Sequence, residues 1–146
     1  MLNSSLSNQH RIIIGIDPGT ETGFAVWDKL DREFREINSC KIHEALRRVL
    51  EYQRNHWEEL FVRFEDARLR TWFGNTGPEK WKGAGSIMRD CSIWQDFLQD
   101  NGVHFAGMAP RIGLTKMPAD KFKAFTGWQW KTNNHGRDAA MLVYGY

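Results

Sequence analysis

The stretch that most constrains the fold is residues 11–24, which read RIIIGIDPGTETGF. Four isoleucines run into Asp17, and a Pro-Gly pair follows at once. A β-branched run of this kind is typical of a strand that is buried on both faces, and such strands lie in the centre of a sheet. Asp17 is then a carboxylate at the exit of a central strand, where a charge is costly unless a metal, a hydrogen-bond donor or a cation meets it.

Length and composition limit the class of protein. The chain has 146 residues, the size of one ordinary domain with its own core. We expect a flexible polar tail over residues 1–10 and a single domain over residues 11–146. A net charge of +2 does not by itself indicate a nucleic-acid-binding protein. Cys40 and Cys91 lack metal-ligand spacing, and we find no membrane span or signal peptide, so we expect a soluble intracellular protein with free thiols and no membrane partner.

The hydrophobic pattern predicts an α/β fold. After the first strand we expect strands over residues 24–27, 33–41, 60–64 and 103–108, and helices over residues 42–55, 85–100, 118–125 and 137–144. Short connections predict that the first three strands are antiparallel, and the helix before the fourth predicts parallel pairing for the last two. Residues 67–82 are predicted to form a long loop. The expected architecture is a five-stranded mixed sheet flanked by helices.

Acidic residues stand at the ends of two predicted strands and near the last helix. Asp17 follows the first strand, Glu65 closes the fourth, and His135 and Asp138 are three residues apart, so both can face one way. Carboxylates gathered at one sheet edge repel each other unless a divalent cation neutralises them. Oxygen ligands suit Mg²⁺ or Mn²⁺, and an imidazole suits Mn²⁺ better. The alternative to a metal site is that these four residues form ordinary helix caps and salt bridges. Asp66 follows Glu65 directly, so strand alternation predicts that it faces the opposite side of the sheet and has a structural role.

Three segments in matching order carry a family resemblance: IIGIDPGTETGFAVWD, RFEDARLR and HGRDAAML. Over residues 11–144 the chain resembles the RuvC family of Holliday-junction resolvases, within the RNase H-like superfamily, and KAFTGWQWKTNNHGRDAAML is most similar to bacteriophage and prophage members. The resemblance implies an RNase H-like fold and an endodeoxyribonuclease, active in DNA recombination and repair. Such an enzyme resolves four-way junctions by paired symmetric nicks that a ligase can seal.

The resemblance also implies a site and partners. Asp17, Glu65, His135 and Asp138 would be the catalytic and metal-ligating residues, with two Mg²⁺ ions per active site, for which Mn²⁺ can substitute. Whether His135 ligates a metal or transfers a proton stays open. The implied partners are branched DNA and a second copy of the chain in a homodimer, in the nucleoid region of the cytoplasm of a bacterial or phage-infected cell.

Basic and aromatic residues interleave after Glu65. Cationic side chains track phosphates, and exposed rings stack on unpaired bases. The resemblance implies that one aromatic ring of this segment enters the junction, with Trp72 and Phe73 as candidates and packing under the loop as the alternative. Trp128 and Trp130 could stack on DNA too, although core packing is the preferred interpretation. The predicted DNA-binding residues are Arg68, Arg70, Trp72, Phe73, Lys80, Lys82, Lys121, Lys123 and Arg137.

Other functions remain open at this point. The metal core would be shared by an RNase H-like nuclease that cuts other branched DNA or structured RNA. A nuclease-dead DNA-binding module would keep the fold without cutting. An actin-like nucleotide-binding fold is disfavoured. Such a fold needs two domains of this kind and a second glycine-rich phosphate loop, and this sequence has neither the length nor the loop. A broad apolar face on helix 85–100 predicts that it buries both the sheet and a partner subunit.

Overall fold

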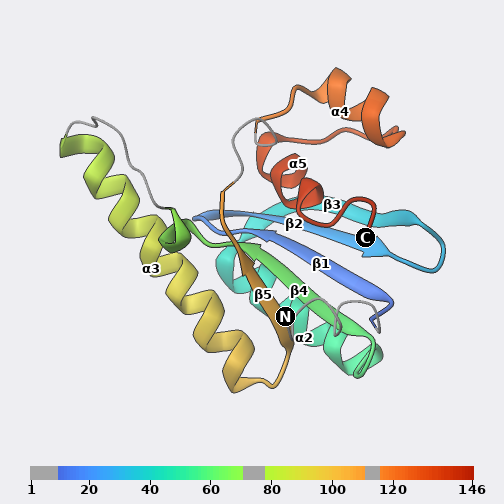
Figure 1. The fold of residues 1–146 in the computed structure, drawn as a ribbon, viewed down its shortest axis with the longest axis horizontal. Helices are drawn as coiled ribbons and strands as arrows, with labels where there is room; N and C mark the ends of the chain where they lie inside the picture. Colours follow the sequence, from blue (N-terminus) through green and yellow to red (C-terminus); the bar gives the residue numbers. More distant parts are fainter. Residues whose placement is uncertain (1–9, 71–77, 111–115) are drawn as a thin grey trace.

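A five-stranded mixed sheet forms the centre of the protein and confirms the predicted α/β class (Figure 1). The computed structural model describes residues 10–70, 78–110 and 116–146, and residues 78–84 by their backbone alone. The sheet order is β3-β2-β1-β4-β5, so β1 is central, as the isoleucine run predicts. The strands β1 to β3 pair antiparallel, whereas β4 runs parallel to β1 and β5 parallel to β4. The bounds are β1 (Ile12–Asp17), β2 (Glu21–Asp28), β3 (Glu33–Lys41), β4 (Leu60–Glu65) and β5 (His104–Met108).

Helices cover both faces of the sheet. They are α2 (Ile42–Asn55), the short 3₁₀ helix η1 (Ala67–Leu69), α3 (Pro78–Asp100), α4 (Ala119–Thr126) and α5 (Asn134–Met141). The side chains of β1 alternate, because Ile12, Ile14 and Ile16 pack in the core under α2 and α3. Ile13 packs in a second core with residues of α4 and α5. The result is three layers, with α2 and α3 on one side and α4 and α5 on the other (Figure 1).

Two glycines allow α5 to lie very close to the sheet. A Cβ atom added to Gly15 on β1 would clash with the carbonyl oxygen of Ala139, and one added to Gly23 on β2 would clash with that of His135. Gly23 is also the residue that pairs with Asp17 across the β1–β2 ladder. The absence of side chains at these positions therefore brings the first turn of α5 directly over the carboxyl end of β1.

The structure corrects two helix starts. The helix α3 begins at Pro78, so residues 78–82 are helical and do not belong to the predicted loop. The helix α5 begins at Asn134, three residues before the predicted start, because the side chain of Asn133 caps it. The Asn133 Oδ1 atom accepts a hydrogen bond from the Gly136 backbone N–H at 2.9 Å, which satisfies a donor that the first helical turn leaves unpaired.

His10 corrects the predicted tail boundary. Its side chain is buried, its ring lies against Phe61, and its Nε2 atom is 2.8 Å from the Nδ1 atom of His104. The domain therefore includes residue 10, and the rest of the predicted tail, residues 1–9, lies outside the described residues. Within the described part of the chain, no helix has both the length and the apolar character needed to cross a lipid bilayer.

Candidate active site

Two acidic side chains meet at the carboxyl ends of neighbouring parallel strands. Ile16 on β1 pairs with Phe64 on β4, and Asp17 and Glu65 come one residue later on each strand. Ile16 and Phe64 both pack in the core under α2 and α3. Alternation therefore turns Asp17 and Glu65 to the α5 side of the sheet. The sequence predicted that these carboxylates emerge at one sheet edge, and the described strands place them there.

The helix α5 brings the other two predicted residues to this edge. The Nδ1 atom of His135 lies 3.6 Å from the Oδ2 atom of Asp17. Asp138 and Glu65 line the same cavity of about 210 Å³ between the sheet and α5. The start of α5 is tied to the sheet as well as capped, since the side chain of Asn133 donates a 2.5 Å hydrogen bond to Ser39 on β3. Four residues that are far apart in the sequence thus share one site.

The backbone of Lys116 is a part of the site that side-chain patterns did not predict. Its backbone N–H donates a 2.8 Å hydrogen bond to Oδ1 of Asp138. The residue has a φ of 61°, a left-handed conformation that is uncommon for residues other than glycine. This backbone bond orients the Asp138 carboxylate. The identity of residue 116 as a lysine carries no information about this backbone contact.

Burial and neighbouring carboxylates raise the pKa of Asp17 and of Glu65. Burial is the main reason that the pKa of Asp17 rises from 3.8 to about 8, and the nearby charges of Glu65 and Asp138 add to the shift. Burial and then Asp138 also raise the pKa of Glu65, while the cationic Arg70 acts in the opposite direction. The Asp17 side chain is only 17% exposed. The three ionised carboxylates are therefore unfavourable together unless a cation joins them.

The chemistry of this donor set fits a hard divalent cation. Three carboxylates from β1, β4 and α5 supply oxygen atoms, and His135 adds one imidazole nitrogen, which together suit Mg²⁺ or Mn²⁺. As they stand in the described residues, no three His, Cys, Asp or Glu side chains form a ready-made coordination group. The fit therefore rests on the mutual repulsion of Asp17, Glu65 and Asp138, which a cation would relieve.

Asp66 and Arg68 form a structural pair behind the site. Asp66 is buried, it caps η1, and its Oδ2 atom lies 2.8 Å from the guanidinium of Arg68. Arg68 also donates to Ser92 and Gln95 on α3. The prediction that Asp66 is structural is thus confirmed. The predicted contact of Arg68 with DNA has less support, because its guanidinium already joins η1 to α3.

Arg137 is the clearest departure from the predicted DNA-binding set. The residue is only 6% exposed, and its Nε atom donates a 2.8 Å hydrogen bond to the carbonyl oxygen of Met117. Its other nitrogens donate to the backbone and side chain of Thr132 and to the side chain of Asn134. Arg137 therefore joins α5 to the segments that precede α4 and α5, and its guanidinium does not face solvent as a phosphate contact requires.

The remaining predicted contacts fall into two groups. Arg70, Lys121 and Lys123 are exposed, and Arg70 lies near enough to Glu65 to lower the pKa of that carboxyl. These three stay predictions as DNA contacts. The candidate wedge residues Trp72 and Phe73 lie outside the described residues, and only the helical backbone is described at Lys80 and Lys82.

Arg63 is a further residue that the sequence analysis missed. It lies on β4 two residues before Glu65, so alternation puts both on the α5 side, where they line the same cavity. Its guanidinium carbon lies 3.9 Å from the centre of the Tyr146 ring, which covers it. The sequence alone could have indicated this, because residues two positions apart on a strand, such as Arg63 and Glu65, point to the same face of the sheet.

Comparison with known proteins adds no assignment. No protein-family model matches the chain, and no curated protein has a significantly similar sequence.

Proposed function

We propose that this chain is a divalent-metal-dependent endodeoxyribonuclease that resolves four-way DNA junctions by paired symmetric nicks. One observation carries the proposal: three carboxylates from β1, β4 and α5 converge so that burial and mutual repulsion raise the pKa of Asp17 to about 8. Perturbed carboxylates gathered at strand ends are typical of catalytic or metal sites. The resemblance of the three sequence segments to junction resolvases supports the choice of reaction and substrate.

Each residue of the site has a role in this proposal. Asp17, Glu65 and Asp138 would hold the metal ions through carboxylate oxygens, and His135 through its imidazole. Two bound divalent ions would activate water and stabilise the leaving 3′ oxygen of a phosphodiester. Because β1 and its ladder partners fix Asp17, this carboxylate would be the rigid anchor of the site. His135 is half-exposed beside Asp17, which also suits proton exchange with solvent.

Substrate contacts would come from cations at the rim. Arg70 is exposed and lies close to Glu65, which makes it the candidate for contact with a phosphate beside the cut. Lys121 and Lys123 would bind phosphates farther out on α4. Arg137 has no such role in the proposal, because its guanidinium holds α5 in position.

Paired nicks require two active sites, and we propose that a second copy of the chain supplies the other. Cys91, Trp94 and Leu98 of α3 pack in the core of the domain. Ile87 and Ile93 of the same helix are exposed, which supports a second buried surface on α3. The mass in solution at micromolar concentration tests this arrangement. The wild type should be a dimer that an Ile87→Glu/Ile93→Glu double variant weakens, and a monomeric wild type would count against it.

The experiment that tests the function is cleavage of a labelled synthetic four-way junction with and without Mg²⁺ or Mn²⁺. The wild type should nick two opposed strands only with metal, and ligase should seal the nicks. Asp17→Asn should bind the junction without cutting it, whereas Glu58→Gln, which changes an exposed carboxylate, should cut like the wild type. If Asp17→Asn cuts at the wild-type rate, the proposed site is wrong.

A panel of substrates separates the proposal from the alternatives. Faster cutting of flaps, forks or structured RNA than of the junction would favour a related nuclease with another substrate. Binding of the junction without cutting in either metal would favour a DNA-binding module that has lost catalysis. Both results would leave the fold and the acidic cluster unchanged, so the panel tests the substrate and the reaction alone.

A further inference from the structure

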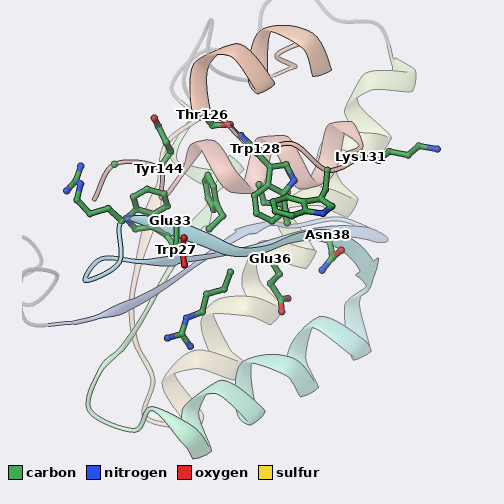
Figure 2. A pocket seen from close by; sticks show the side chains of 15 residues that line it. Trp27, Glu33, Glu36, Asn38, Thr126, Trp128, Lys131 and Tyr144 are labelled. Carbon is green, nitrogen blue, oxygen red and sulfur yellow. Dashed lines mark hydrogen bonds between the residues drawn. The ribbon is translucent and has the colours of Figure 1, made fainter.

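A large groove lies beside β3, apart from the acidic site. We call it the aromatic groove; it has a volume of about 830 Å³ and runs between β3 and the segment that joins α4 to α5 (Figure 2). Its volume is within the range of about 300–1,000 Å³ that is common for ligand sites. A register shift in the β2–β3 ladder puts Phe34 and Ile37, three residues apart, in the same core on the α5 side. The ring of Phe34 thereby becomes part of the groove wall.

The groove presents indole rings to solvent. The rings of Trp128 and Trp130 lie 4.7 Å apart, and Phe34 meets Trp128 edge-on. Trp130 is 69% exposed, although burial of an indole is strongly favourable. The Nε1 atom of Trp128 is buried and has no hydrogen-bond partner among the described residues. The exposed ring of Trp130 is a suitable surface for stacking of a planar aromatic group.

The charges at the groove favour an anion. Arg32 and Lys131 are exposed at its rim, and no ion pair of either is found in the described part of the chain. The carboxylate of Glu36 is turned away, because it accepts hydrogen bonds from Arg48 and Tyr52 on α2, and Figure 2 shows it on that side of the sheet. Among the described residues that line the groove, Glu33 is then the acidic side chain that can oppose the positive charges of Arg32 and Lys131.

One end of the groove lies near the acidic site along the sheet. Figure 2 shows Asn38 and Lys131 at one end and Tyr144 at the other. Asn38 precedes Ser39, which pairs with Gly23, and Gly23 pairs with Asp17. Two strand spacings separate Ser39 from Asp17, about 10 Å. Since a helical strand of DNA rises about 3.4 Å per nucleotide, roughly three nucleotides span this distance.

We propose that the aromatic groove binds an unpaired strand of nucleic acid, with a base stacked on Trp130 and phosphates at Arg32 and Lys131. The inference rests on the proposed function for its direction, because the bound strand would be one that continues from the cut site at Asp17. Stacking on an exposed ring tolerates any base, so this site would contribute affinity for unpaired strands and little sequence preference.

The experiment measures binding of labelled oligo-dT of about ten nucleotides by fluorescence anisotropy. All variants carry Asp17→Asn and are measured without divalent metal, so that nuclease activity does not enter. Trp130→Ala should weaken binding by about 5-fold or more, since one stacked base contributes that much. Trp57→Ala is the matched control, because Trp57 is 68% exposed but lies outside the groove and should have no effect.

A second variant tests the charges independently of the rings. Lys131→Ala should lower the slope of log affinity against log salt by about 0.7, the value for one lost phosphate contact on a single strand. Unchanged oligo-dT binding in both Trp130→Ala and Lys131→Ala would overturn the inference. Because this assay contains no cleavage step, failure to cut junctions with intact oligo-dT binding would overturn the proposed function alone.

Discussion

The substitution Asp17→Asn should stabilise the protein at neutral pH in the absence of divalent metal. Burial and the neighbouring carboxylates raise the pKa of Asp17 from 3.8 to about 8. The folded state therefore binds a proton more tightly than the unfolded state between these pH values. The free energy of unfolding of the wild type falls as pH rises through this window, at about 1.4 kcal/mol per pH unit. Asparagine does not titrate, so the free energy of unfolding of the variant lacks this dependence on pH.

The size of the effect follows from the width of the window. Between pH 4 and pH 7 the wild type should lose up to about 4 kcal/mol relative to Asp17→Asn. For a chain of this length that difference corresponds to a melting temperature higher by roughly 10 °C in the variant at pH 7. At pH 4 the two proteins should melt within a few degrees of each other. Thermal unfolding followed by circular dichroism, in EDTA, over this pH range measures the difference directly.

Asp28 offers a control of opposite sign. Burial acts to raise the pKa of this carboxyl, but hydrogen bonds from Arg11 and Arg35 and from the backbone outweigh burial and hold the pKa well below its usual value. Its ionised form is therefore the stable one in the folded protein. Asp28→Asn should lower the melting temperature at pH 7, with a smaller loss as pH falls toward the low folded pKa.

Divalent metal should narrow the difference in stability between the wild type and Asp17→Asn. Ligands that bind only the folded state stabilise it, by about 2.7 kcal/mol at one hundred times the dissociation constant. Mn²⁺ or Mg²⁺ should therefore raise the melting temperature of the wild type and leave that of Asp17→Asn unchanged. If the wild type shows no loss of stability from pH 4 to pH 7, the carboxylates do not repel each other as described. If both proteins respond equally to metal, the ion binds elsewhere.

Three further substitutions test how the site is built. Gly23→Ala should place a methyl group against the carbonyl of His135, lower the free energy of unfolding by about 2–4 kcal/mol in denaturant titrations and abolish junction cleavage. Arg137→Ala should lower the melting temperature by several degrees, because buried acceptors lose their donor, while the salt dependence of junction binding stays as in the wild type. Arg70→Ala should move the acidic limb of the cleavage pH profile to higher pH, because Arg70 lowers the pKa of Glu65, and Arg70→Lys should restore it.

Local patterns predicted most of the sheet. The apolar runs before Asp17 and Glu65 predicted two buried strands, and each lies between two other strands of the sheet. The meander and the parallel crossover followed from connection lengths, which restrict how strands can pair. The helix over residues 42–55 has the predicted bounds because its apolar stripe is regular and strands border it closely. The start of α5 was missed, although Asn133 is a residue type that favours the helix N-cap.

Contacts between distant segments could not be predicted. Arginine is most often exposed, so the sequence gives no reason to expect a buried Arg137 whose partners lie before α4 and α5. The same holds for the backbone bond from Lys116 to Asp138, which depends on the path of the chain before α4. The close approach of α5 depends on Gly23, which in the sequence reads equally well as a turn residue. In each case the deciding atom is a backbone carbonyl or amide, and patterns of side chains do not report such atoms.

The acidic site and the aromatic groove depend on one segment of the chain. Residues 127–133 join α4 to α5, carry Trp130 and end at the Asn133 cap that fixes the start of α5. His135 and Asp138 follow directly on α5, so the position of this segment determines both the groove and half of the candidate metal ligands. A cation that draws Asp138 toward Asp17 would hold α5 against the sheet, and a strand bound in the groove would hold the segment before it. Binding at one place should therefore strengthen binding at the other by the same factor. Mn²⁺ should tighten oligo-dT binding by the wild type under conditions that prevent cleavage of oligo-dT, and Asp17→Asn should remove this effect while its metal-free affinity stays equal to that of the wild type.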